Sequence, residues 1–271
     1  MTDALQVKGL RKSYGKKEVL KGIDLCVRKG DIFALLGVNG AGKTTTLECI
    51  EGLRKYDGGS ISVDGSIGIQ LQSASLPAHI KGMEAIRLFA KWNRVSADAS
   101  MLAALGTESF ADRQYQEMST GQKRRLHLAL ALTSDPDIVF LDEPTAGLDV
   151  EGRISLHEYI RTLKNKGKTI LLASHDMAEV ENLCDSIAIL KDGRIAFTGT
   201  VAELTEKVGT HYNVRVKAGQ NSGDYEIDNI GPGLIAILQE YQNRNIVIQD
   251  IQVGRGSLEQ HFVKIAGEDD R

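Results

Sequence analysis

Apolar positions along the chain alternate or form short runs in some segments, and recur every three or four residues in others. The first pattern predicts strands and the second predicts helices. Strands are predicted at residues 5–10, 19–27, 31–36, 58–63, 66–71, 137–141 and 169–173. Helices are predicted at residues 45–52, 80–105, 119–132 and 151–165. Because strands and helices alternate after a β-rich front, the pattern predicts an α/β fold with a parallel core.

The predicted helical region 80–105 carries Ala85, Leu88, Phe89 and Trp92 at spacings of three and four, so we expect these side chains in the core. The polar stretch that follows it, GTESFADRQYQEM, lacks a strong apolar stripe. It is therefore read as a polar stretch between the helices predicted at 80–105 and 119–132.

The last part of the chain has a different character. Lys191-Asp192-Gly193-Arg194 predicts a hairpin turn, residues 211–216 and 245–253 alternate like strands, and residues 233–241 between them read as a helix. Ser257 is placed to cap a last helix, and the acidic end after it is expected to be frayed. We predict a main domain at 1–208 and a small α+β domain at 209–271.

Composition narrows the class of protein. At 271 residues, with 42% hydrophobic and 25% charged residues, the chain fits one large domain with a small appendage. A net charge of −3 gives no general affinity for nucleic acid. The chain shows no secretory signal and no apolar run of about 18 residues, so a cytoplasmic protein is expected. Cys26, Cys49 and Cys184 lack metal-ligand spacing and are expected to be buried free thiols.

Residues 37–44, GVNGAGKT, match the motif G-x-x-x-x-G-K-[ST]. Its glycines let backbone N–H groups turn around an anion, and the next helix points its positive dipole end at the same place. Lys43 is predicted to reach the terminal phosphates and Thr44 to ligate Mg²⁺. The alternative is a plain strand-to-helix turn with a chance lysine. A predicted strand before the motif and a helix after it favour the phosphate site.

Two carboxylates, Asp142 and Glu143, end a buried strand, at the edge of a parallel sheet where ligands bind. Neighbouring residues of a strand point to opposite sides, so Asp142 can face the Mg²⁺ while Glu143 faces the attacking water. A solvated acidic turn before Pro144 is the alternative, and it is disfavoured because Mg²⁺ on a phosphate loop needs an acidic partner.

Tyr14 and His175 are further candidates. Tyr14 is either a turn aromatic or a surface for a base to stack on, and the second is favoured. His175 follows an apolar strand; it is either a buried histidine or, as we favour, a hydrogen-bond donor to a phosphoryl group.

Six segments in order, SYGKKEVL, GVNGAGKTT, IGIQLQ, MSTGQKRRL, IVFLDEPTAGLD and ASHDMAEVE, resemble the ATP-binding subunit of an ABC transporter from about residue 5 to 199. The resemblance implies a P-loop NTPase of the ABC ATPase type, with a mixed sheet, an antiparallel β subdomain and a short helical subdomain at about 73–135. It implies that Tyr14 stacks on adenine, that Gln72 senses Mg²⁺ and contacts the membrane partner, that Asp149 crosses a dimer interface and that His175 contacts the γ-phosphate.

With this resemblance, the expected catalytic residues are Glu143, His175 and Gln72, and the expected Mg²⁺ ligands are Thr44, Gln72 and Asp142. The expected ATP-binding residues are Tyr14, Gly37, Asn39, Gly40, Ala41, Gly42, Lys43, Thr44, Thr45, Ser119, Gly121, Gln122 and Asp149.

The segment MSTGQ departs from the usual LSGGQ of the family at Met118 and Thr120. Ser119 and Gln122 also fit a capping box, which is compatible with an anion site at the same helix start. In the family this site presses on the γ-phosphate held by the opposite subunit, so Ser119 and Gly121 are expected to make a working but weaker contact. The three basic residues 123–125 are expected only to solvate the helix face.

The ending SLEQHF resembles the SLE-x-x-F ending of ATPase subunits of ABC-2 type exporters of the drug or antibiotic resistance type. That resemblance implies an ATPase that powers export through a separate multi-spanning permease, at the cytoplasmic face of the membrane. A second ATPase subunit is expected, in a homodimer rather than a heterodimer, and no nucleic acid. The alternatives are a soluble ABC ATPase that acts on a target such as the ribosome, and a regulatory module with little turnover.

Overall fold

The computed structural model describes residues 2–70, 76–174, 176–208, 212–218 and 221–255, with 258, 259, 262 and 265. The chain forms two compact units, Met1–Thr198 and Gly199–Arg271. The predicted domain boundary after residue 208 lies at the far end of helix α7 (Val201–Val208), and it stays a prediction.

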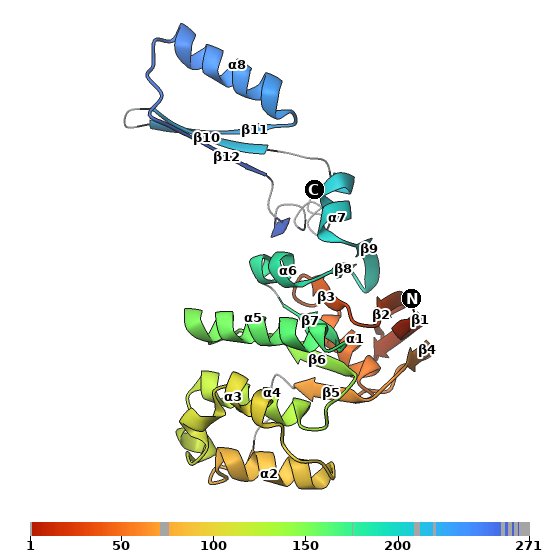
Figure 1. Cartoon of the computed structure of the whole chain (residues 1–271). Coiled ribbons are helices and arrows are strands. Elements are labelled where there is room, and N and C mark those ends of the chain that lie inside the picture. The colour runs from red at the N-terminus through yellow and green to blue at the C-terminus, as the bar shows by residue number, and fades with distance from the viewer. Residues whose placement is uncertain are drawn as a thin grey trace. The chain divides into compact units, whose positions relative to one another are not determined.

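A six-stranded sheet is the centre of the first unit (Figure 1). Its strands are β3 (Ile32–Gly37), β5 (Ile67–Gln70), β6 (Ile138–Asp142), β7 (Thr169–Ala173), β8 (Ser186–Lys191) and β9 (Arg194–Gly199), in the order β5-β6-β7-β3-β8-β9. The pairs from β5 to β8 are parallel. Between β8 and β9, Asp192 and Gly193 both have positive φ, which confirms the predicted hairpin turn.

A second, antiparallel sheet belongs to the same unit, with the order β2-β1-β4. Its strands are β1 (Asp3–Tyr14), β2 (Lys17–Arg28) and β4 (Gly58–Val63). Alternate residues of β3, such as Phe33 and Leu35, share one core with Leu47 of helix α1 (Lys43–Ile50) and with inward residues of β1 and β2. The mixed parallel and antiparallel architecture confirms the predicted P-loop fold class.

The remaining helices of this unit are α2 (Gly82–Trp92), α3 (Ala99–Ala104), α4 (Thr120–Leu132), α5 (Val150–Asn165) and α6 (Met177–Leu183), with 3-10 turns at Thr107–Phe110 and Tyr115–Glu117. Figure 1 shows α2, α3 and α4 gathered beside the edge strand β5. This group occupies the predicted position of the helical subdomain.

The prediction of one helical region over 80–105 with Leu88 and Trp92 in the core is wrong. The helix stops at Asn93, and α3 starts again at Asp98, whose carboxylate accepts from the Ser100 N–H at 2.8 Å. Leu88 is 51% and Trp92 80% exposed, because the buried face of α2 is turned toward Ala85, Ile86 and Ala90. The apolar spacing is present in the sequence, but α2 packs through the neighbouring face, which carries Ala85, Ile86 and Ala90.

The cysteines are free thiols, as predicted, but they are not all buried. Cys49 is buried and Cys184 partly so, whereas Cys26 lies on the outward side of β2 between the buried Leu25 and Val27. Strand alternation explains the difference.

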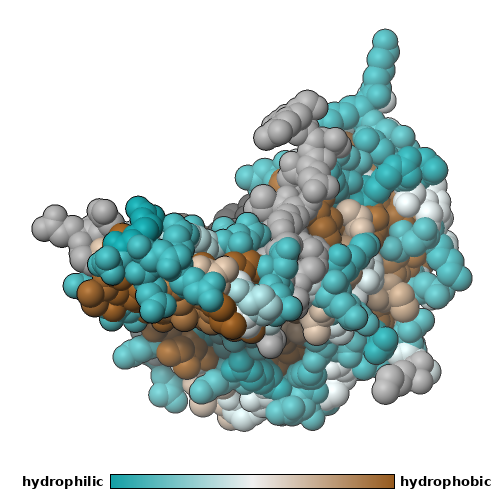
Figure 2. All heavy atoms as spheres, turned by 90° about the horizontal axis from the view of Figure 1, so that it is seen from above, coloured by the Kyte–Doolittle hydropathy of each residue, from teal (hydrophilic) through white to brown (hydrophobic). Residues whose placement is uncertain are grey.

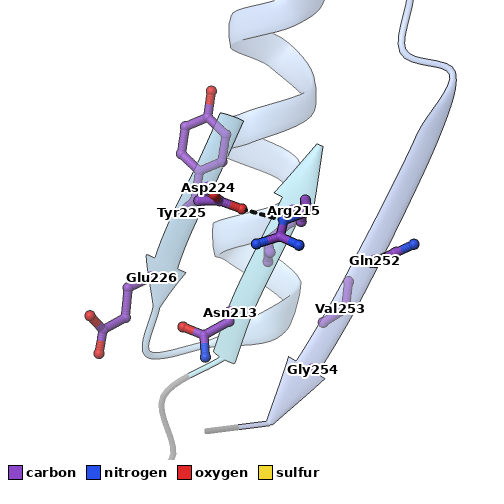
Figure 3. A pocket seen from close by; sticks show the side chains of 9 residues that line it. Asn213, Arg215, Asp224, Tyr225, Glu226, Gln252, Val253 and Gly254 are labelled. Carbon is purple, nitrogen blue, oxygen red and sulfur yellow. Dashed lines mark hydrogen bonds and ion pairs between the residues drawn. The ribbon is translucent and has the colours of Figure 1, made fainter. Parts of the chain in front are cut away.

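The second unit contains a three-stranded antiparallel sheet, β11-β10-β12, covered on one face by α8 (Ile230–Asn243). The strands are β10 (Tyr212–Ala218), β11 (Asn221–Ile227) and β12 (Asp250–Arg255). Val214 and Val216 pack against Ile237 and Tyr241 of α8. The opposite face is polar, and in Figure 3 Arg215 pairs across it with Asp224 at 2.7 Å. These elements are consistent with a small α+β domain.

Two predictions for this unit need correction. Strand β11 was not predicted because its sequence, NSGDYEI, is polar on one side and carries a glycine. The strand predicted at 245–253 begins only at Asp250, since Asn245 takes a positive φ and Ile246 N–H bonds back to the Tyr241 carbonyl at the end of α8. Ser257, predicted to cap a last helix, lies outside the described residues.

Large apolar residues also reach the surface, and Figure 2 shows several on one face among hydrophilic ones. None of the helices in the described ranges is long and apolar enough to cross a membrane.

Candidate nucleotide-binding site

The loop between β3 and α1 is shaped by two glycines that no other residue can replace without strain. A Cβ at Gly37 would lie 2.6 Å from the Leu190 carbonyl oxygen. One at Gly42 would lie 2.8 Å from Cδ2 of Leu20, and Gly42 has a φ of 110°. The tight loop therefore follows directly after the buried strand β3, at the carboxyl edge of the sheet.

This loop leaves donors open to an anion. Among the described residues no side chain caps the N-terminus of α1, so its first N–H groups remain available. Asn39 and Gly40 are exposed at the tip, Ala41 is buried beneath it, and Thr44 is exposed at the helix start while Thr45 is half-buried. Lys43 Nζ donates to the Gly37 carbonyl at 2.6 Å and to the Val38 carbonyl at 3.3 Å. The lysine thus lies along the loop that is predicted to hold phosphates.

The two acids stand next to this lysine. Asp142 is paired with Ala173 at the end of β6, and the Glu143 N–H donates to the Ala173 carbonyl at 2.8 Å. Glu143 has a φ of 50°, a left-handed conformation that is uncommon for a non-glycine residue and marks a sharp turn directly after β6. The chain therefore leaves the strand direction at Glu143.

Electrostatics connect the three groups. Burial lowers the pKa of Lys43, and the Glu143 and Asp142 carboxylates oppose that shift. Burial raises the pKa of Asp142, and the charge of Glu143 adds to it, while Arg124 and Lys43 act in the other direction. Burial, followed by the charges of Asp142 and Glu48, raises the pKa of Glu51 to about 7. The site is therefore crowded with acids and suited to a further cation.

In the described part of the chain no group of three or more His, Cys, Asp or Glu side chains is arranged to hold a metal ion. Mg²⁺ on a phosphate loop does not need such a group, since its usual protein ligands are one hydroxyl and one carboxylate, completed by phosphate oxygens and water. The exposed Thr44 and the acid Asp142 fit that donor set.

Tyr14 lies at the end of β1 with 42% of its surface exposed. Its ring has Lys12 Nζ at 5.6 Å and the Arg54 guanidinium at 5.4 Å from the centroid. The ring is accessible and surrounded by cations, which suits a nucleotide. Stacking on adenine stays a prediction.

The start of α4 confirms the predicted capping box. Ser119 Oγ accepts from the Gln122 N–H at 3.2 Å, and Gln122 Oε1 accepts from the Ser119 N–H at 3.1 Å. Ser119 and Gly121 line a groove of about 760 Å³ together with Gly147 and Asp149. Asp149 in turn caps α5 by accepting from the Gly152 N–H at 2.9 Å. Residues from two helix starts thus line one groove, and the contact of this groove with ATP stays a prediction.

Arg124 was predicted only to solvate the helix face, and that prediction is wrong. Its guanidinium Nη1 donates to the Glu143 carbonyl, linking α4 to the acidic turn. Arg125 lies over the Phe110 ring, with 5.7 Å between its guanidinium and the ring centroid. A run of basic residues contains no signal for these contacts, which exist only in the folded unit. Gln72 and His175 lie outside the described residues.

The comparisons with known proteins agree with this geometry. The profile of the family described as "ABC transporter" matches residues 20–146. The chain is 37% identical over 220 residues to the Nod factor export ATP-binding protein I of Burkholderia orbicola, covering 74% of this chain and 72% of that protein. It is 34% identical over 223 residues to the linearmycin resistance ATP-binding protein LnrL of Bacillus subtilis, covering 76% and 72%.

Solved structures share the fold. One described as the ATP binding subunit of an ABC transporter superposes with a TM-score of 0.71 at 29% identity, over 75% of this chain and 92% of that one. A nucleotide-free ATP-binding cassette from an ABC transporter gives a TM-score of 0.66 at 23% identity, over 73% and 92%.

Proposed function

The chain belongs to the family of ABC transporter ATP-binding proteins and is therefore an ATPase, and from that premise we propose that it powers an exporter whose membrane-spanning part is a separate chain. The observation that carries the direction of transport is similarity to proteins named for Nod factor export and linearmycin resistance. The transported substrate would be recognised by the separate chain.

The proposed chemistry uses the groups around the loop. Lys43 leaves the carbonyls of Gly37 and Val38 and donates to the terminal phosphates, together with the uncapped N–H groups at the start of α1. Thr44 and Asp142 would hold Mg²⁺, which neutralises phosphate charge when bound. Glu143 orients the attacking water, and Arg124 fixes the backbone of that turn through the Glu143 carbonyl.

A second subunit completes the proposed site. Ser119, Gly121 and Gln122 of one subunit would donate to the γ-phosphate held by the other, and Asp149 would cross between them. Gln72, His175 and Tyr14 take the roles predicted from the family resemblance. Because ATP held between two subunits has higher affinity for the closed pair, binding favours closure, and loss of γ-phosphate contacts on hydrolysis allows opening.

We place the protein at the cytoplasmic face of the membrane, bound to a multi-spanning permease, as a homodimer and without nucleic acid. The test is affinity purification of the tagged chain from detergent-solubilised native membranes, with identification of the proteins that co-purify. A stoichiometric multi-spanning protein is expected. Recovery only with ribosomes, or alone from the soluble fraction, would contradict the export proposal and favour a soluble ABC ATPase.

A further inference from the structure

Glu179, on α6, is a buried acid that the proposed chemistry does not use. It is 3% exposed, and both carboxylate oxygens are engaged. Oε2 accepts from Ser174 Oγ at 2.6 Å, and Oε1 lies 3.2 Å from Nε2 of His157 on α5. A buried carboxylate is costly unless such contacts satisfy it, so these two contacts are expected to be strong.

The same network holds the chain on both sides of residue 175. The Asp176 N–H donates to Ser174 Oγ at 3.1 Å, and the Glu179 N–H donates to Asp176 Oδ1 at 3.1 Å. Ser174 therefore donates to Glu179 and accepts from Asp176 with one hydroxyl. Residues 174 and 176 are fixed relative to each other through the start of α6.

Helix α5 contributes a stripe of three side chains that contact the segment after residue 175. Arg153 Nη1 lies 3.6 Å from Asp176 Oδ2, His157 contacts Glu179, and Arg161 Nη2 donates to the Asn182 carbonyl at 3.3 Å. These three residues are four apart in sequence, so they lie on one face of the helix. The first turn of α5 is capped by Asp149, so the stripe runs from the predicted subunit interface to the flanks of residue 175.

We propose that Glu179 is a positioning residue for ATP hydrolysis, which holds the backbone on either side of His175 and ties it to the helix that carries Asp149. The inference rests on the proposed function and on the predicted role of His175. Glu179 acts through His175 rather than on the nucleotide. Its loss should therefore lower kcat and leave the ATP dissociation constant nearly unchanged.

The experiment compares Glu179→Ala and Glu179→Gln with the wild type in steady-state hydrolysis and in ATP titration. Glu179→Ala is expected to lower kcat about 10- to 100-fold, the range of a buried hydrogen bond to a charged group, with the ATP Kd changed less than about threefold. Glu179→Gln should recover most of the rate, because its amide can accept from Ser174 and donate to the other tautomer of His157. Glu181→Ala, at an exposed position of the same helix, is the matched control and should equal the wild type.

A double-variant cycle with His175→Ala separates positioning from mere packing. If Glu179 acts through His175, adding Glu179→Ala to His175→Ala should cost less than about twofold. Should Glu179→Ala fold poorly, Ser174→Ala carries the test, since it removes one hydroxyl from the same network and leaves no large cavity. A full multiplicative loss in the His175→Ala background, or an unchanged kcat in Glu179→Ala or Ser174→Ala, would overturn the inference. Wild-type turnover, measured first, tests the proposed function separately.

Discussion

At the scale of single residues, the most important group of the site is Lys43, which lies close to the acids Asp142 and Glu143. Lys43 donates to two loop carbonyls, while Asp142 and Glu143 offset the effect of its burial on its pKa. An anionic phosphate can replace the carbonyls as acceptor, and this exchange gains a charge-assisted contact. Binding should therefore depend strongly on this one side chain.

Lys43→Ala is expected to weaken ATP affinity at least about tenfold, because the charge-assisted contact to phosphate is lost. Titration of a fluorescent ATP analogue measures the dissociation constant directly. Lys91→Ala, an exposed lysine on α2, is the control for general charge effects. Unchanged affinity in Lys43→Ala would contradict the phosphate-loop assignment.

Glu51 makes stability depend on pH. Its pKa is raised from 4.5 to about 7 in the folded protein, so between these values the folded state binds the extra proton. Protonated Glu51 is favoured over ionised Glu51 in the folded state. The resulting contribution to the free energy of unfolding is fully present below about pH 4.5 and is lost as pH rises through about 7. Glu51→Gln should thus raise the free energy of unfolding at pH 8 by about 1–2 kcal/mol, allowing for partial solvent screening, and by much less at pH 5.

Thermal or urea unfolding in nucleotide-free, EDTA-containing buffer at both pH values measures this difference. The exposed Glu158→Gln should show no such pH-dependent gain. An equal effect of Glu51→Gln at pH 5 and pH 8 would exclude a raised pKa at this position.

At the scale of elements, two helix starts form the second surface predicted to meet ATP. Ser119 both caps α4 and lines the groove, so its two roles can be separated by the choice of substitution. Ser119→Ala should cost about 1 kcal/mol of stability through loss of the cap. Ser119→Asp retains a capping acceptor but places a negative charge where the γ-phosphate of the partner subunit is expected.

We therefore expect Ser119→Asp to keep the melting temperature of the wild type and to lose ATPase activity by about tenfold or more. Calorimetry and a phosphate-release assay on the same samples give both values. Normal turnover in Ser119→Asp would mean that this helix start does not meet the phosphate.

Local sequence was sufficient for some of these features and insufficient for others. The glycine loop, the acids at the end of β6 and the capping box of Ser119 and Gln122 were predictable, because each depends on neighbouring residues. The contact of Arg124 with the Glu143 carbonyl was not, since it joins residues brought together only by packing. Strand β11 was not predicted, because it is fixed by pairing with β10 and not by its own polar sequence. The wrong face of α2 was predicted to be buried, because the helices that pack against α2 decide which face is covered.

At the scale of the whole molecule, one chain carries only part of each proposed site. The loop and the acids would hold a nucleotide, while Ser119, Gly121 and Asp149 are predicted to reach the nucleotide of a second subunit. ATP is then expected to shift the equilibrium toward a closed pair through its higher affinity for that state. Blocking hydrolysis without disturbing binding should make the pair accumulate.

The most direct measurement is the mass of Glu143→Gln in the presence of Mg²⁺ and ATP, by light scattering, together with its rate of phosphate release. Gln has nearly the same shape as Glu but cannot orient water as a base, so hydrolysis should fall at least about 100-fold and the mass should double only when ATP is added. The double variant Lys43→Ala/Glu143→Gln should remain a monomer. Undiminished hydrolysis, or an ATP-saturated monomer, would contradict the assignment of Glu143 and of a nucleotide shared between two subunits.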